Sequence, residues 1–167
     1  MKDRCPYLIR VVEEQDRAWV NGLIKSQWGD DSVVIHGEIY FPERLPGFIA
    51  CKPDEVAAGL VTYQIRAEVC EIITLNSLIE NQGVGSMLLA AVREEAEKAN
   101  CSQLCLTTTN DNQDAIEFYK NRDFRLVEIR KGAVDKARQI KPSIPQLSSQ
   151  GIPICDEWDF VLDLCDP

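Results

Sequence analysis

The sequence Glu80-Asn81-Gln82-Gly83-Val84-Gly85-Ser86 follows a strand-like run and opens an amphipathic helical pattern. Two glycines that flank one apolar residue at the start of a helix let backbone N–H groups approach an anion closely. A second segment, residues 110–119, reads N-D-N-Q-D-A-I-E-F-Y and predicts a helix with a polar N-terminal cap and a tyrosine about two turns further on. We therefore expect an anion-binding loop and a phenol on neighbouring helices.

The sequence around these two segments mixes strand and helix patterns. Strands are expected at residues 7–12, 103–109, 124–129 and 157–164, and an antiparallel meander at residues 48–51, 56–65 and 69–75. Helices are expected at residues 13–24, 86–99 and 114–121. Residues 27–47 predict a mobile, loop-rich region over one end of the sheet. Residues 132–153, with one helical turn at 133–140, predict a loop-rich insertion within a single domain that spans residues 1–167.

Composition narrows the classes of function. The chain has 167 residues and a formal net charge of −9, with no run of Lys or Arg, so it would repel the phosphate backbone of nucleic acid. The first residues lack the apolar stretch of a signal peptide, and no run of about 18 apolar residues offers a membrane span. We expect a cytoplasmic protein that binds neither nucleic acid nor membranes.

Cysteine and histidine usage argues against metal and histidine chemistry. The seven cysteines form no Cys-x-x-Cys pair and lie mostly in apolar segments, which predicts reduced core thiols. His36 is the single histidine, so we expect no metal site. A nucleophilic triad would depend entirely on His36, and Tyr, Glu and Asp are the expected agents of acid–base chemistry.

The glycine loop does not fit two common nucleotide-binding motifs. The dinucleotide fingerprint needs a third glycine where this chain has Leu88, and a phosphate loop of the Walker type needs a Gly-Lys-Ser/Thr sequence that is absent. An isolated glycine pair is about as often an ordinary turn as a binding loop. The interpretation therefore depends on the second segment.

Together the two segments resemble motifs of the GNAT superfamily of acetyl-CoA-dependent N-acetyltransferases. The loop pattern Arg/Gln-x-x-Gly-x-Gly/Ala is matched at Glu80, Gly83 and Gly85. The later pattern Asn-x-x-Ala-x-x-Phe-Tyr, followed by Gly-Phe, is matched at Asn112, Ala115, Phe118, Tyr119 and Phe124. The resemblance is clearest over residues 68–124. It implies an α/β (α+β) fold in which a mixed, mainly antiparallel sheet, flanked by helices, splays where the cosubstrate inserts.

Two positions depart from the family pattern. Glu80 stands where the family has Arg or Gln, and a carboxylate beside a pyrophosphate is unfavourable. Backbone N–H groups make the main contacts in this family, so the departure weakens the inference of cofactor binding without removing it. Asp123 replaces the glycine before Phe124, at a position expected to be left-handed, which Asp tolerates at modest cost.

The resemblance also implies which residues bind acetyl-CoA. The backbone of Leu75, Asn76 and Ser77 would pair with the pantetheine arm. The pyrophosphate would be wrapped by the loop residues Gln82, Gly83, Val84, Gly85 and Ser86. Asn112 would contact the cosubstrate near its thiol end, and Tyr119 would lie close to the sulfur. The N-terminus of a helix carries about half a positive charge, which agrees with anion binding by an acidic protein.

The family's mechanism is direct attack of an amine on the thioester. Tyr119 is the expected proton donor to the departing thiolate, with packing under the sheet as the alternative. Glu71 is the expected base, because strand alternation places it on the same face as Ile73 and Leu75, with a water chain or a solvated edge residue as alternatives. Ser77 either bonds the thioester or substrate, or caps a loop.

The acceptor is expected to be an amine of a small molecule or peptide. Acidic residues in the variable regions favour a cationic amine: Asp30, Asp31, Glu38, Glu43, Asp156 and Glu157. Two other functions compete with catalysis. Glu80 favours a CoA-sensing or partner-binding module without efficient transfer, and a glycine loop that is only a turn would indicate an interaction domain that does not bind CoA. Homodimerisation is an expectation from the family alone.

Overall fold

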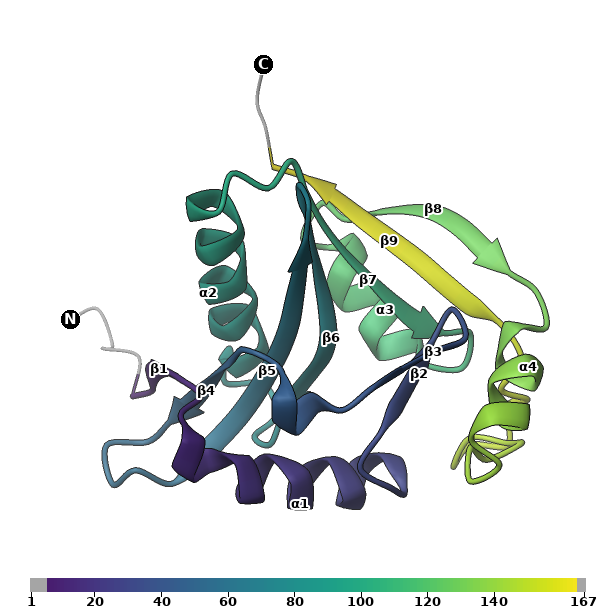
Figure 1. Cartoon of the computed structure of the whole chain (residues 1–167), viewed down its shortest axis with the longest axis horizontal. Helices are drawn as coiled ribbons and strands as arrows, with labels where there is room; N and C mark the ends of the chain where they lie inside the picture. The colour runs from purple at the N-terminus through teal and green to yellow at the C-terminus, as the bar shows by residue number, and fades with distance from the viewer. Residues whose placement is uncertain (1–5, 165–167) are drawn as a thin grey trace.

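A seven-stranded sheet forms the centre of the computed structural model, which describes residues 6–164 (Figure 1). Its strands are β1 (Leu8–Val11), β4 (Gly47–Cys51), β5 (Ala57–Arg66), β6 (Val69–Ser77), β7 (Gln103–Thr109), β8 (Arg125–Arg130) and β9 (Glu157–Asp163). They lie in the order β1-β4-β5-β6-β7-β9-β8, and every neighbouring pair is antiparallel except β6 and β7. The expected mixed, mainly antiparallel sheet is confirmed.

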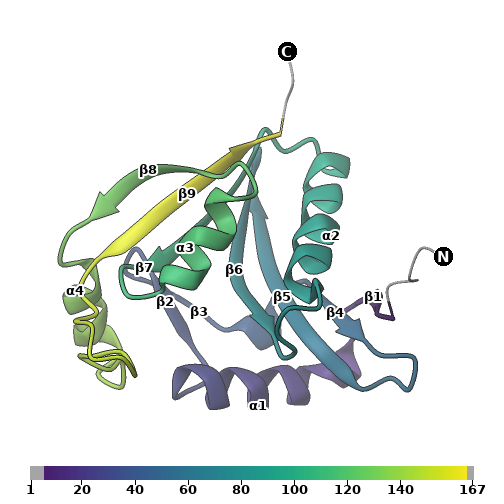
Figure 2. The same ribbon diagram turned by 180° about the vertical axis from the view of Figure 1, so that it is seen from behind.

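Helices cover both faces of this sheet. The α-helices are α1 (Arg17–Trp28), α2 (Val84–Lys98), α3 (Gln113–Lys120) and α4 (Ala133–Ile140), and two short 3₁₀ helices are η1 (Glu14–Asp16) and η2 (Pro42–Arg44). Figure 2 shows α2 and α3 together on one face of the sheet. Helix α1 lies on the other side and runs across one end of β4, β5 and β6. Within residues 6–164, no helix has the length and apolar character needed to cross a membrane.

Two hydrophobic clusters fix these layers. On the face of α2 and α3, Leu88 and Val92 pack with Val61, Leu104 and Phe160. On the other face, a second cluster joins α1 to the sheet through Val20, Ile24, Ile49, Leu60 and Ile73. Burying a side chain of this size contributes about 1.5–3 kcal/mol, so the two clusters hold both helical layers against the sheet.

The segment expected to be loop-rich, residues 27–47, is more ordered than the sequence predicted. It contains an antiparallel hairpin of β2 (Val33–Ile35) and β3 (Glu38–Tyr40), in which Ile35 pairs with Glu38. The two turn residues, His36 and Gly37, both have positive φ, at 50° and 76°, as a two-residue hairpin turn of type I′ requires. The expectation of a loop-rich segment was therefore wrong where this hairpin forms. The β-branched residues before His36-Gly37 are typical of a strand that leads into a hairpin turn.

A β-bulge interrupts the alternation of β6. Thr62 pairs with Thr74 and Tyr63 pairs with Ile72, which leaves Ile73 as an additional residue. As a result Ile73 packs in the cluster beside α1, whereas Leu75 packs against the cluster beside α2. The expectation that Glu71, Ile73 and Leu75 share one face was therefore wrong for Leu75.

Five cysteines lie within residues 6–164, and all five are free thiols: Cys51, Cys70, Cys101, Cys105 and Cys155. Cys51, Cys70 and Cys101 are buried, and burial raises the pKa of the Cys70 thiol to about 12. The Cys70 thiol is therefore protonated at neutral pH. The other two cysteines of the sequence, Cys5 and Cys165, lie outside the described residues.

Helix α2 rests on β5 at Gly59, where there is no room for a side chain. A Cβ atom at Gly59 would lie 2.7 Å from the Val84 side chain and 2.8 Å from the backbone oxygen of Asn76. Gly22, on the exposed side of α1, has nothing within 4 Å of the same position. Gly59 thus sets the distance between the start of α2 and the sheet.

These two glycines give a matched pair of alanine substitutions. Gly59→Ala should lower the free energy of unfolding by about 1–3 kcal/mol, because it overpacks a closed site. Gly22→Ala should raise it by about 0.5–1 kcal/mol, because alanine favours the helix. Urea unfolding followed by circular dichroism measures both changes. Equal effects of the two substitutions would contradict the close contact between α2 and β5.

Candidate functional site

Strands β6 and β7 separate after a short paired region. They pair only where Val69–Ile72 faces Gln103–Leu106, and beyond this β7 continues to pair with β9. Figure 1 shows the two strands diverging toward their C-terminal ends. Within residues 6–164, no strand pairs with residues 73–77 of β6 on the side of β7. That edge presents backbone N–H and C=O groups to an extended ligand.

Helix α2 begins immediately after this open edge. Its N-cap, Gly83, has φ of 76°, a conformation that glycine adopts without strain, and no side chain caps the helix. The first-turn N–H groups therefore have no acceptor within the helix and carry partial positive charge. A Cβ atom at Gly83 would meet nothing within 4 Å, so the loop is not packed against a neighbour at this position. The loop is suited to binding an anion.

Side chains around the loop have partners that the sequence did not reveal. Gln82 accepts a hydrogen bond from the Tyr7 hydroxyl, and the Ser86 hydroxyl accepts one from Arg122 Nη2 at 2.6 Å. The Arg122 guanidinium also lies 3.6 Å from the centre of the Phe118 ring. Arg122 thus places a cation beside the start of α2. It lies 36 residues after Ser86 in the sequence, and no motif in the chain predicted this contact.

The three expected pantetheine-binding residues differ in their surroundings. Leu75 is half-buried against the cluster beside α2, and the Asn76 Oδ1 atom is buried with no hydrogen-bond partner in the described structure. The Ser77 hydroxyl donates to the backbone oxygen of Ile79 at 2.8 Å. Of the two roles considered for Ser77, its contacts are those of a residue that caps a loop.

Helix α3 and its N-cap supply Asn112 and Tyr119, the two residues of the second motif that are expected to contact acetyl-CoA. Asn112 is its N-cap, and the side-chain oxygen accepts a hydrogen bond from the Ala115 N–H at 3.3 Å. Tyr119 is buried among aromatic rings, with ring centres 5.1 Å from Phe118 and 5.4 Å from Phe124. Burial raises the pKa of Tyr119, so its phenol keeps its proton at neutral pH.

A cavity of about 690 Å³ opens where β6 and β7 separate. Ile73 of β6 and Thr107, Thr108 and Thr109 of β7 form its floor, and Asn112 lies at its rim on the side of α3. Its walls come from the end of α1, from β2, from α4 and from the loop that follows α4. The cavity and the open edge of β6 therefore meet at the same gap in the sheet.

The predicted insertion forms one wall of this cavity. Arg138 of α4, whose side chain is 9% exposed, donates hydrogen bonds to the backbone oxygens of Ile144, Pro145 and Ile154, which holds the loop in place. Lys141 lines the cavity, but its ammonium group donates to the Ser32 backbone oxygen and pairs with Asp30 at 3.0 Å. Its positive charge is therefore balanced within the wall.

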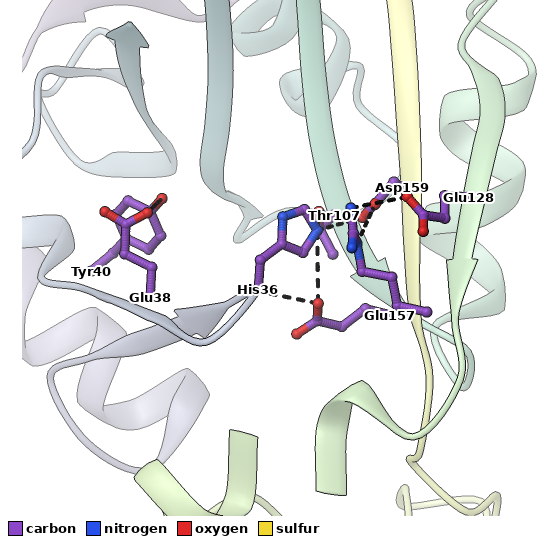
Figure 3. Close-up of polar contacts among 8 residues, drawn as sticks. His36, Glu38, Tyr40, Thr107, Glu128, Glu157 and Asp159 are labelled. Carbon is purple, nitrogen blue, oxygen red and sulfur yellow. Dashed lines mark hydrogen bonds and ion pairs between the residues drawn. The ribbon is translucent and has the colours of Figure 1, made fainter. Parts of the chain in front are cut away.

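A cluster of charged residues adjoins the cavity at Glu157 (Figure 3). His36 Nε2 lies 2.7 Å from Asp159 Oδ1, and Arg130 Nε donates to Asp159 Oδ2 at 2.8 Å. The Glu157 carboxylate accepts the His36 backbone N–H at 3.3 Å. Asp159 raises the pKa of His36 through this hydrogen bond, while burial raises the pKa of Glu157. From the sequence, Glu157 was expected only as one of several acidic residues that favour a cationic amine.

The expected base, Glu71, lies elsewhere. It stands opposite Cys105, in the region where β6 and β7 still pair, and its carboxylate accepts a hydrogen bond from Gln64 at 3.1 Å. Glu71 is not among the residues that line the cavity, whereas Glu157 is. The roles assigned to Glu71 and Tyr119 stay predictions, and the structure adds Glu157 as a carboxylate in direct contact with the cavity.

Comparison with known proteins identifies the family. The model of the acetyltransferase (GNAT) family matches residues 8–124. The uncharacterized protein YdhI of Bacillus subtilis (strain 168) is 42% identical over 133 residues, which cover 80% of this chain and 83% of YdhI. An acetyltransferase of B. subtilis solved in complex with CoA has a similar fold, with a TM-score of 0.69, 18% identity, and coverage of 95% of this chain and 99% of that one.

A further solved structure has the same fold. The GNAT family acetyltransferase of Elizabethkingia anophelis, solved with acetyl-CoA bound, superposes with a TM-score of 0.67 at 18% identity, covering 96% of this chain and 100% of that one. At these identities the likeness concerns the fold. The match of the family model over more than half of the sequence goes further: this chain belongs to the GNAT acetyltransferase family.

Proposed function

We propose that this protein is an N-acetyltransferase that moves the acetyl group of acetyl-CoA to the amine of a small molecule or peptide. One observation carries the proposal. The open edge of β6 and the uncapped start of α2 lead to the same gap between β6 and β7 onto which the cavity of about 690 Å³ opens. A cosubstrate and an acceptor that enter from the two sides would meet at this gap.

The residues around the loop fit acetyl-CoA. The first N–H groups of α2 would bind the pyrophosphate, and Arg122, held by Ser86, would add a side-chain cation that offsets the exposed carboxylate of Glu80. The pantetheine arm carries amides, which suit the free backbone groups of residues 73–77. The unpartnered Asn76 Oδ1 atom also requires a donor. Solved GNAT structures with CoA and acetyl-CoA bound support acetyl-CoA as the cosubstrate.

Tyr119 is proposed as the acid that protonates the leaving thiolate. It lies seven residues after the Asn112 cap, in the second turn of α3, and its buried phenol stays protonated at neutral pH because its pKa is raised. Within residues 6–164, no side chain or backbone group makes a hydrogen bond with its hydroxyl that would compete for the proton.

The cavity favours an amine attached to an apolar body. Its walls include Trp28, Val33, Ile35, Val134 and Ile154, whereas Asp111, Asp114 and Glu157 supply carboxylates. The one lysine in the wall, Lys141, is paired with Asp30. Apolar walls with an excess of carboxylates would bind the hydrocarbon part of the acceptor and attract its ammonium group. Of the six acidic residues that the sequence suggested for this role, only Glu157 lines the cavity.

A CoA-binding module without efficient transfer is the second candidate. Glu80 is the observation that favours it, because this exposed carboxylate lies three residues before Gly83 of the phosphate loop. Such a module would bind acetyl-CoA at the same loop but would not release CoA when amines are added. Binding and turnover therefore have to be measured separately.

An acceptor screen tests the proposed function. The wild-type protein, acetyl-CoA and a thiol reagent that detects free CoA are combined with hexylamine, phenethylamine and tryptamine, and with ethanolamine and spermidine as polar amines. We expect kcat/KM to be about 10-fold or more higher for the apolar amines, because apolar walls discriminate by about 1–3 kcal/mol. A thermal shift with acetyl-CoA but no amine-dependent release would favour the binding module, and the absence of both would contradict the proposal.

A charge substitution tests the place assigned to the pyrophosphate. Arg122→Met should weaken acetyl-CoA binding by about 10-fold or more, since a hydrogen bond to a charged group contributes about 1.5–3 kcal/mol. Arg125→Met is the control, because Arg125 is exposed and pairs with Asp163 at 3.2 Å. Calorimetric titration at two salt concentrations gives both dissociation constants. Equal affinities for the two variants would contradict the role of Arg122.

A further inference from the structure

Glu157 combines burial with direct access to the cavity. It is the first residue of β9 and is 3% exposed, yet it lines the cavity together with Ile73, Thr109 and Asn112. We propose that Glu157 is the general base that takes a proton from the acceptor amine. This inference rests on the proposed N-acetyltransferase function and assigns the base within it.

The two oxygens of the Glu157 carboxylate have different surroundings. Oε2 accepts the His36 backbone N–H at 3.3 Å and lies 3.8 Å from His36 Nε2. Within residues 6–164, Oε1 accepts no hydrogen bond, and Figure 3 shows one carboxylate oxygen directed away from the contacts with His36. A base needs one oxygen to orient it and one free to accept a proton, and Glu157 has both.

Several charged groups around Glu157 set its proton affinity. Burial and Asp159 raise the pKa of Glu157, whereas His36 and Arg130 lower it, with burial the largest cause. The carboxylates of Asp111 and Asp114 and the paired ammonium of Lys141 face the same cavity. A carboxylate whose pKa is raised is a stronger base than an exposed one.

His36 acts as a positioning residue. Its ring is held by Asp159, and the Asp159 carboxylate is fixed in turn by Thr107 Oγ1 at 2.8 Å and by Arg130. The His36 side chain is 37% exposed, so it reaches solvent from beside the buried Glu157. The hairpin of β2 and β3 thereby brings His36 to Glu157 of β9, 121 residues later in the sequence, and orients the base.

In the proposed acetyl transfer, Glu157 and Tyr119 each handle one proton. The acceptor enters as an ammonium ion, and Glu157 takes one proton, which leaves a neutral amine. The amine nitrogen forms a bond with the thioester carbonyl carbon, and the bond between that carbon and sulfur breaks. The sulfur gains a proton from Tyr119, and the second proton that the nitrogen loses as the amide forms restores the Tyr119 phenol. The products are the acetylated amine, CoA as a thiol, and one proton that Glu157 returns to solvent.

Glutamine substitutions test this assignment on the full chain with phenethylamine as the acceptor. Glu157→Gln should lower kcat by about 100-fold or more, the usual contribution of a general base, with an unchanged thermal shift by acetyl-CoA. Glu94→Gln is the control and should retain wild-type kcat, because Glu94 is exposed on α2, pairs with Lys98 at 2.9 Å and does not line the cavity. A large loss in Glu71→Gln, with an active Glu157→Gln variant, would overturn the proposal.

The pH profile separates a base from a structural residue. In the wild type, kcat/KM should fall as pH decreases through the pKa of Glu157, and this limb should be absent in Glu157→Gln. With β,β-difluorophenethylamine, whose amine is less basic, the loss caused by Glu157→Gln should shrink by about 10-fold or more, because less of the acceptor needs deprotonation. An equal loss for both amines would assign Glu157 a structural role and overturn the proposal.

A second variant covers the case in which Glu157→Gln does not fold. His36→Asn keeps a residue that tolerates the positive φ of 50° and removes the cation that lowers the pKa of Glu157. The acidic limb should therefore move to higher pH. A limb that stays in place would overturn the proposal, and a wild type that transfers no acetyl group to any amine would instead contradict the proposed function.

Discussion

The separation of β6 from β7 is the constraint on which the rest of the structure depends. Parallel pairing holds these strands together over Val69–Ile72, and then β7 keeps β9 as its partner while β6 stays with β5. The bulge at Ile73 coincides with this point and increases the local bend of β6. Backbone groups that a continuous sheet would satisfy internally are thus left free for a ligand.

Both sides of this gap are built from parts that are distant in sequence. On one side, the start of α2 and the guanidinium of Arg122 supply positive potential in a protein whose net charge is −9. On the other side, the hairpin, α4 and the loop after it enclose a cavity with an excess of carboxylates. An anionic cosubstrate and a cationic acceptor would each meet the opposite charge, which explains how one acidic chain serves both.

Local signals predicted a large part of this arrangement. The glycine pair predicted the start of α2, Asn112 is a helix cap as expected, and Asp123 has the left-handed φ, at 67°, that its place in the motif required. Each of these depends on backbone preferences of a few neighbouring residues. The hairpin turn at His36-Gly37, with positive φ at both residues, also depends on such local backbone preferences. It could therefore have been predicted from the sequence.

Other features depend on contacts that no local pattern encodes. The bulge at Ile73 reverses the face of Leu75, and period-two alternation cannot anticipate an additional residue. Arg122 meets Ser86 across 36 positions, and His36 meets Glu157 across 121. Glu71 looked like the better base because it lies in an apolar strand near the motif. Only the tertiary structure shows which carboxylate lines the cavity.

Amide hydrogen exchange with and without acetyl-CoA tests the central claim most directly, because it reports on the open edge itself. The account predicts slower exchange on binding at the amides of residues 73–77 that face β7 and at the first N–H groups of α2, with unchanged exchange in β8. Saturable binding of acetyl-CoA that protects other amides and leaves both of these segments unchanged would contradict it.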